Sequence, residues 1–279
     1  MTAKTTVPEE NGVPSQNTKI QIGTSGYSYD DWRGLFYPDG IQKKDMLEYY
    51  TKYFNTVEIN ATYYAIPSAD VFRRMAEKTP GQFEFIVKTH QETTHRRVEN
   101  ESTFKILAEA VQPLIESGKF RGFLAQFPYS FKNNEAGRKY LIETRKYAGK
   151  FPLFAEFRHS SWNKPQLVPF MKNHGIGYVN VDEPALAGLM PVQDIATAET
   201  GYIRFHGRNK ENWWIGQGSA RYDYEYKEEE LKQWLIHISN LMKKTYKTYI
   251  FFNNHPNGKA VKNARQMMSL IDKMQQKLL

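Results

Sequence analysis

Eight short segments rich in β-branched and aromatic residues recur along the chain, and this repetition constrains the fold more than any other feature of the sequence. Strands are predicted at 19–23, 56–60, 83–89, 120–127, 152–158, 177–182, 201–206 and 247–253. Most are followed by stretches with the apolar spacing of helices, at 44–54, 68–78, 101–117, 134–147, 165–173, 227–244 and 258–277. Only the connection after the sixth strand, at 183–200, lacks a long helical pattern.

Alternating strands and helices predict an α/β fold with a parallel sheet, and eight such units predict a (β/α)8 TIM-type barrel. A length of 279 residues permits one barrel or two smaller domains. No Pro-rich or Ser-rich linker divides the repeats, so we expect a single barrel domain over 19–279. A doubly wound open sheet is the alternative, but its G-x-G-x-x-G first turn is replaced here by Gly23-Thr24-Ser25-Gly26. Residues 1–18 lack an apolar run and are predicted to form a disordered tail.

The amino-acid composition of the chain excludes several classes of function. The chain has no cysteine, which excludes disulfides, thiolate nucleophiles and cysteine-containing zinc sites and favours a reducing, cytoplasmic location. No apolar stretch approaches the ~20 residues needed to cross a bilayer, so no membrane association is predicted. A net charge of +8 with 14% aromatic residues suits a nucleotide or nucleic acid partner. A lysine-rich surface and a large aromatic core give the same totals, and no protein partner is predicted.

Polar or ionisable side chains end most of the predicted strands. Residues two apart on a strand share a face. The resulting pairs are Glu58 with Asn60, Lys88 with His90, Glu156 with Arg158, Asn180 with Asp182, and Arg204 with His206, and Asn253 ends the eighth strand. Outward positions would drive charges under the covering helices at a large cost in free energy, so we expect these faces to point inward at the carboxyl-terminal mouth of the barrel. Some pairs, such as Glu58 with Arg204, could instead only close salt bridges inside the barrel.

Aromatic residues gather in the loops that follow three of these strand ends, within 27–37, at 63–64 and within 213–226. Rings at a barrel mouth can stack on bases or sugars, and they can equally pack over the barrel as a lid or bury a contact between subunits.

The polar set favours recognition of a phosphate-bearing ligand, a small molecule or a nucleic acid, because arginine forks hold phosphate oxygens bidentately. Lys88, Arg158 and Arg204 are the predicted phosphate-binding residues, joined by Asn60 and Asn253. Hydrolytic or acid–base chemistry follows if a neighbouring carboxylate or imidazole moves a proton. The predicted catalytic residues are Glu156 or Asp182 as base, His206 as acid, and Glu58.

Other chemistries remain open. A metal would have to be held by His, Asp and Glu, but Arg158 and Arg204 would oppose a dication, so no cofactor is predicted. Glycoside hydrolysis needs two carboxyl groups about 5–10 Å apart. Glu58, Glu156 and Asp182 could supply such a pair, so a carbohydrate-active enzyme is one alternative. However, the fourth and seventh strands end in Gln126 and His206. A non-catalytic binding or partner module is another.

Short motifs follow one another in order along the chain: 22–29 (IGTSGYSY), Trp32, 36–38 (FYP), 57–60 (VEIN), 62–64 (TYY), Lys88 with 94–95 (TH), 126–128 (QFP), 156–159 (EFRH) with 161–162 (SW), Asp182 with Pro184, 204–207 (RFHG) and 252–254 (FNN). In these motifs the chain resembles the YecE-like family, domain of unknown function 72. The resemblance implies a TIM-type barrel of the kind shared with sugar isomerases and metal-dependent abasic-site endonucleases, and no settled activity. Its motif positions add His95 and Trp162 to the predicted ligand-binding residues, which also include Tyr27, Trp32, Gln126, His159 and Asn254.

Overall fold

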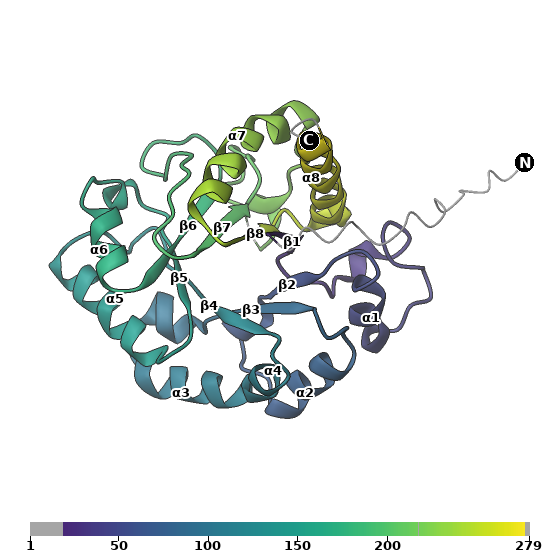
Figure 1. Cartoon of the computed structure of the whole chain (residues 1–279), viewed down its shortest axis with the longest axis horizontal. Coiled ribbons are helices and arrows are strands. Elements are labelled where there is room, and N and C mark those ends of the chain that lie inside the picture. The colour runs from purple at the N-terminus through teal and green to yellow at the C-terminus, as the bar shows by residue number, and fades with distance from the viewer. Residues whose placement is uncertain (1–18, 217, 277–279) are drawn as a thin grey trace, which may run out of the picture.

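The computed structural model describes residues 19–216 and 218–276, and the predicted tail at 1–18 lies outside them. All eight predicted strands are present and pair in parallel in the order β1-β8-β7-β6-β5-β4-β3-β2. They are β1 (Ile20–Thr24), β2 (Thr56–Ile59), β3 (Glu84–Lys88), β4 (Phe120–Gln126), β5 (Leu153–Glu156), β6 (Ile176–Asp182), β7 (Thr200–Phe205) and β8 (Lys247–Phe252). The predicted single-domain (β/α)8 barrel is confirmed, with its strands at the centre and its helices around them (Figure 1).

The seam between β1 and β2 closes the barrel by close approach of the backbones. Ser25 forms a parallel bridge with Glu58, and the Gly26 N–H donates to the Glu58 carbonyl at 2.7 Å. A Cβ atom on Gly23 would lie 2.2 Å from the Thr56 carbonyl oxygen. Glycine is therefore needed at position 23, because any side chain would push the two strands apart.

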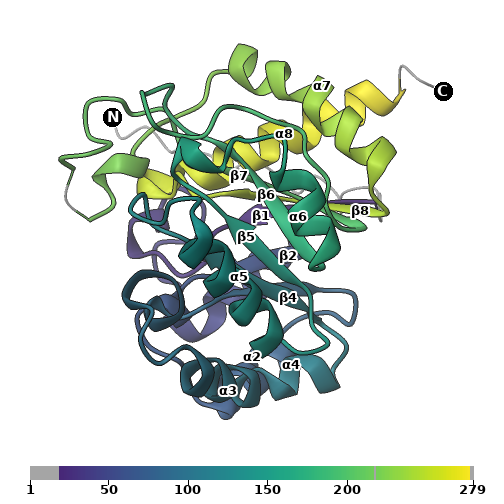
Figure 2. The same ribbon diagram turned by 90° about the vertical axis from the view of Figure 1, so that its left-hand side faces the viewer.

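The helices form the outer layer. They are α1 (Met46–Tyr50), α2 (Ala69–Glu77), α3 (Asn100–Ala110), α4 (Gln112–Glu116), α5 (Glu135–Tyr147), α6 (Leu167–Asn173), α7 (Glu228–Lys244) and α8 (Lys259–Gln276). Figure 2 shows α2, α3 and α4 on one side of the strands and α7 and α8 on the opposite side. Among the described residues, no helix is long and apolar enough to span a bilayer.

Two helix predictions need correction. The helix predicted over 101–117 is two helices, because Pro113 lies at the start of α4 and cannot donate to the preceding turn. The helix predicted over 44–54 is confined to Met46–Tyr50, preceded by a 3-10 turn at Lys43–Asp45. The connection between β6 and β7 contains no helix, as predicted.

A polar cluster that the sequence did not indicate closes the barrel interior at the amino-terminal end of the strands. Glu84 accepts hydrogen bonds from Arg121 Nε (2.6 Å), Lys247 Nζ (2.7 Å) and the Tyr249 hydroxyl (2.7 Å). These groups come from three strands and satisfy one another. Because the amino-terminal face of such barrels serves stability, we assign this cluster a structural role.

The seam gives the first testable prediction. The Tyr50 hydroxyl accepts from the Thr24 N–H (2.9 Å) and donates to the Thr56 carbonyl (3.1 Å), so it joins β1 to β2. Tyr50→Phe leaves both buried backbone groups unpaired and should lower the free energy of unfolding by about 2 kcal/mol. Urea denaturation measures the loss, with Tyr246→Phe, at a side chain that is 81% exposed, as the neutral control. Equal midpoints for the two variants would contradict this account of the seam.

Candidate functional site

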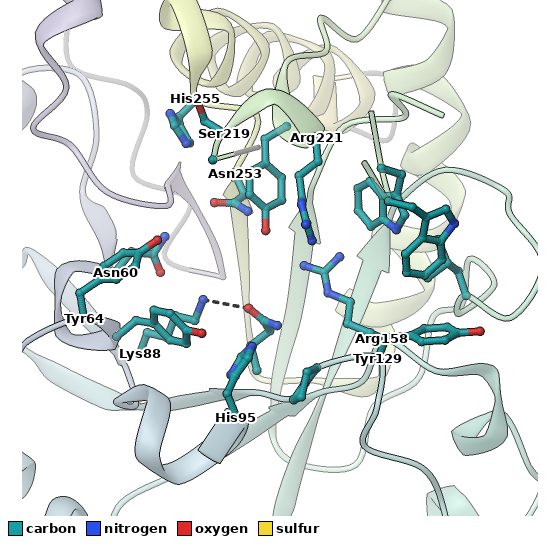
Figure 3. A pocket seen from close by; sticks show the side chains of 18 of the residues that line it. Asn60, Tyr64, Lys88, His95, Tyr129, Arg158, Ser219, Arg221, Asn253 and His255 are labelled. Atoms are coloured by element: carbon teal, nitrogen blue, oxygen red, sulfur yellow. Dashed lines mark hydrogen bonds between the residues drawn. The ribbon is translucent and has the colours of Figure 1, made fainter. Parts of the chain in front are cut away.

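A cavity of about 690 Å³ opens at the carboxyl-terminal mouth of the barrel. Six of the predicted site residues line it: Asn60, Lys88, His95, Gln126, Arg158 and Asn253. Figure 3 shows Lys88 and Asn60 on one side of the cavity and Arg158 on the other. The structure thus brings together at the mouth predicted side chains that lie on β3 and β4 or that follow β2, β5 and β8.

A buried ion-pair cluster, made of Glu58, Glu156, Arg204 and Arg158, forms the floor beneath this cavity. Arg204 bridges two of its carboxylates, with Nη2 2.6 Å from Glu58 Oε1 and Nη1 2.7 Å from Glu156 Oε2. All three of these residues are fully buried. Burial would raise the pKa of Glu156, but Arg204, His206 and Arg158 hold that pKa well below its ordinary value. Glu58, Glu156 and Arg204 thus point inward, and the salt bridge between Glu58 and Arg204 that the sequence left open is present.

Arg158 connects this cluster to the cavity. Its Nε lies 2.9 Å from Glu156 Oε1 and its Nη1 lies 2.7 Å from Glu183 Oε2. Its guanidinium also lies over the Trp213 ring, 5.3 Å from the centroid. Arg158 is 7% exposed and lines the cavity, so its planar fork is fixed in place yet reachable by a ligand.

Glu156 and His206 do not fit the catalytic roles predicted for them. The His206 ring is fully buried, with Nε2 3.1 Å from Glu156 Oε1 and Nδ1 3.1 Å from the Asn253 amide nitrogen. Burial and then Arg158 lower the pKa of His206 to about 3, so the ring is neutral at pH 7. Neither side chain is among the residues that line the cavity. Their contacts position Arg158 and Asn253 instead.

Lys88, His95 and His255 line the cavity and have lowered pKa values, the last because of burial. Lys88 Nζ donates to Gln126 Oε1 at 2.8 Å and lies 4.7 Å from the Tyr63 ring centroid. Burial, with Arg204 nearby, lowers the pKa of Lys88 to about 7. Burial and then the charge of Lys88 lower the pKa of His95 to about 4. At pH 7 the Lys88 amine is therefore about half protonated and the His95 ring is neutral.

Asp182 was predicted to reach the mouth, and this prediction is wrong. Its two carboxylate oxygens accept from Arg208 (2.9 and 2.6 Å), the Tyr226 hydroxyl (2.7 Å) and the indole of Trp234 on α7 (2.6 Å). Asp182 therefore faces outward, under the helix layer. Its partners lie 26 to 52 residues further along the chain. No local sequence pattern therefore indicates that an outward carboxylate at this position has hydrogen-bond donors around it.

The register of β6 explains the error. Gly177 pairs with Phe154, and a Cβ atom on Gly177 would lie 2.5 Å from that ring inside the barrel. Odd-numbered positions of β6 therefore face inward, and the inward carboxylate at the end of this strand is Glu183, which the sequence reasoning missed. Burial raises the pKa of Glu183 to about 7 in spite of its contact with Arg158.

Arg204, predicted to bind phosphate, is fully buried between Glu58 and Glu156 and does not line the cavity. Five further predicted ligand-binding residues do not line it either: Tyr27, Trp32, His159, Trp162 and Asn254. Both tryptophans are fully buried and donate to backbone carbonyls, Trp32 to that of His255 and Trp162 to that of Phe131, each at 2.8 Å. They are packing residues that fix loops beside the mouth.

The other three have local roles as well. Asn254 donates to the Tyr224 carbonyl at 2.8 Å, and His159 accepts from the Ser161 N–H at 3.0 Å. The Tyr27 ring packs on Tyr50, with centroids 6.2 Å apart. Each of these contacts orders a loop rather than presenting a group to the cavity.

Loop residues complete the lining, and the strand-end reasoning could not select them. Arg221, Ser219 and Trp214 come from the long connection between β7 and α7, and His255 follows β8. The cluster of aromatic residues within 213–226 was the available signal. Within the described ranges, no group of three or more His, Cys, Asp or Glu side chains is arranged to hold a metal ion.

The fold and this mouth define a single-domain (β/α)8 barrel with a polar cavity at the carboxyl ends of its strands. The model of the family described as "Protein of unknown function DUF72" matches residues 21–279, and the chain belongs to that family. It is 33% identical over 270 residues to UPF0759 protein YunF of Bacillus subtilis (strain 168), covering 91% of this chain and 95% of that protein.

Solved structures support the same assignment. A DUF72 family protein of Thermotoga maritima MSB8 is 40% identical, with a TM-score of 0.85 over 91% of this chain and 99% of that one. A DUF72 family protein of Enterococcus faecalis V583 is 26% identical, with a TM-score of 0.81 over 91% and 95%. The predicted family resemblance is confirmed.

The ion-pair cluster gives the second prediction. Arg204→Met leaves Glu58 and Glu156 buried without their shared cation and should lower the free energy of unfolding at pH 7 by about 3–5 kcal/mol. In the wild type, the low folded-state pKa of Glu156 contributes stability above the ordinary carboxyl pKa, and this contribution is lost as pH falls through the folded value. Without Arg204 the folded-state pKa rises, so the difference between variant and wild type should shrink below roughly pH 5.

Chemical denaturation at pH 7 and pH 4.5 measures both effects. Arg73→Met serves as the control, because Arg73 pairs with Asp70 on the exposed face of α2 and such pairs contribute about 0–1 kcal/mol. A loss for Arg204→Met that is as small as the control's would show that the cluster does not stabilise the barrel.

Proposed function

We propose that this protein binds a phosphate-bearing ligand with a flat ring, such as a nucleotide or a stretch of nucleic acid, in the mouth cavity. The observation that carries the proposal is the charge of the lining. Arg158 and Arg221 contribute permanent cations, Lys88 contributes a partial positive charge at pH 7, and none of the described lining residues is Asp or Glu. The carboxylates of the site lie below, paired with arginines, so the surface that a ligand meets is positive.

Arg158 has the donors that a phosphate needs. A guanidinium carries five N–H groups. Nη1 donates to Glu183 Oε2 at 2.7 Å, and Nη2 lies 3.2 Å from His206 Nε2. Each Nη atom carries two N–H groups, so these contacts leave one on each for a ligand. A pair of parallel N–H donors held by buried carboxylates suits bidentate binding of phosphate oxygens.

Exposed aromatic side chains in the lining support a ring-bearing ligand. Tyr64 is 75% exposed and Trp214 is 50% exposed, yet both line the cavity. Exposed rings of this size bury apolar area when a base or sugar stacks on them, at about 1–3 kcal/mol per stacked base. The absence of carboxylates from the described lining does not suit a glycosidase, which needs two of them beside the scissile bond.

Acid–base chemistry on the ligand is the second part of the proposal. Lys88 and His95 line the cavity, and their pKa values of about 7 and about 4 leave a proton donor and a neutral base side by side at pH 7. In this proposal the buried Glu156 and His206 hold Arg158, and the proton is moved by the two cavity residues. A site that binds the ligand and yields no product would make the protein a binding module instead.

The third prediction tests the binding. Titration of the wild type with adenosine 5′-monophosphate and with a twelve-residue oligothymidylate should change the fluorescence of Trp213 and Trp214, which line the cavity. Arg221→Gln should weaken binding roughly tenfold, the loss of one charge-assisted hydrogen bond. Binding should also weaken as salt rises, more for the oligonucleotide than for the mononucleotide.

Arg73→Gln removes one positive charge from α2 and is the matched control, for which we expect wild-type binding. Affinity that is insensitive both to Arg221→Gln and to salt would refute phosphate recognition at this mouth.

A further inference from the structure

Lys88 differs from the two buried arginines beneath the cavity. Arg204 and Arg158 each contact two carboxylates, whereas no carboxylate of the described residues lies within 4.0 Å of Lys88 Nζ. Its hydrogen-bond partner is the neutral amide of Gln126, at 2.8 Å, and the Tyr63 ring lies on another side. A lysine at a cavity floor without a counter-charge is poorly placed as a permanent cation.

The Gln126 amide is oriented for this contact. Its Nε2 donates to the Phe127 carbonyl at 3.4 Å, which turns Oε1 toward Lys88 Nζ. Oε1 accepts an N–H from an amine as well as from an ammonium, so the contact holds Nζ in place in either protonation state. Burial and the nearby charge of Arg204 outweigh the opposing charges of Glu58 and Glu156, so the pKa of Lys88 is lowered and the uncharged amine is favoured. The lone pair of that amine is a nucleophile.

We propose that Lys88 is an amine nucleophile that forms a covalent imine with an aldehyde or ketone group of the ligand. The inference rests on the proposed function for the phosphate that anchors the ligand, and it adds the carbonyl group to the substrate class. Figure 3 shows Lys88 and Arg158 on opposite sides of the cavity. A phosphorylated aldehyde or ketone can therefore extend from the Arg158 fork, which holds its phosphate, to Nζ, which meets its carbonyl carbon.

The covalent step balances without a further reactant. The lone pair of Nζ forms a C–N bond with the carbonyl carbon while the C=O π pair moves to oxygen, which takes a proton to give a carbinolamine. The nitrogen then loses its remaining proton, the hydroxyl group leaves with a proton as water, and a C=N bond forms. One amine and one carbonyl thus become one imine and one water. The neutral His95 ring in the same cavity can accept the proton from nitrogen and return it to the leaving hydroxyl.

Reductive trapping tests this proposal. The full chain is incubated at pH 7 with D-glyceraldehyde 3-phosphate and cyanoborohydride, which reduces an imine to a stable secondary amine. Intact mass and peptide mapping then locate the adduct. We expect one dominant, saturable adduct on Lys88, absent from Lys88→Met and from Lys88→Arg, which keeps a positive charge. Lys172→Met, at an exposed position on α6, should keep the adduct.

Modification of Lys88 that is no greater than that of surface lysines, or the same dominant adduct in Lys88→Met, would overturn the inference. Unphosphorylated glyceraldehyde separates this failure from failure of the proposed function. We expect at least a tenfold lower half-saturating concentration for the phosphorylated compound. Equal trapping of both compounds on Lys88 would keep the imine and refute phosphate anchoring. Fluorescence-detected binding of the phosphorylated compound without modification of Lys88 would keep phosphate binding and refute the imine.

Discussion

The bridging of two buried carboxylates by Arg204 is the interaction on which the rest of the mouth depends. Glu58 comes from β2 and Glu156 from β5, strands that are not neighbours in the sheet, and Arg204 on β7 reaches both. Glu58 also accepts from the Tyr202 hydroxyl at 2.5 Å. A carboxylate inside a barrel is tolerated only when its charge is compensated, and Arg204 compensates both carboxylates across the interior.

The buried ion-pair cluster determines the charge and the rigidity of the cavity lining above it. Glu156 is shared between Arg204 below and Arg158 above, so the carboxylate that neutralises the interior also fixes the orientation of the cavity arginine. Because the carboxylates are engaged by arginines below the lining, Lys88 has no counter-charge of its own. One buried network thus accounts for two features of the surface above it: a rigid guanidinium fork on one side and an amine with a lowered pKa on the other.

The fold could be predicted from the sequence because its signals are local. Each strand and helix carries its own periodicity, and the alternation of strand and helix has one compact solution in a chain of this length. The inward faces of β2, β3, β5 and β7 could be predicted for the same reason, since polar residues two apart at a strand end have few other places to lie. The motifs that pointed to the family coincide largely with these strand ends.

The position of a side chain could not be predicted where its hydrogen-bond partners come from a distant part of the sequence. Asp182 was assigned to the mouth because an outward charge was expected to lack partners, and Arg208 and Trp234 supply them from beyond β7. Trp32 was assigned to ligand binding because aromatic loop residues can stack on ligands, and Trp162 because it lies in a family motif. Both indole N–H groups instead bind backbone carbonyls of other loops. Arg221 was missed because the path of its long loop follows from packing rather than from periodicity.

The central claim is that the Arg158 fork, held by buried carboxylates, receives a phosphate in the mouth cavity. A crystal structure of the protein soaked with adenosine 5′-monophosphate tests it most directly. The account predicts phosphate oxygens within hydrogen-bond distance of both Nη atoms of Arg158, with the base against the aromatic wall that contains Trp214. A nucleotide bound elsewhere on the molecule, or bound in the cavity with its phosphate turned away from Arg158, would contradict it.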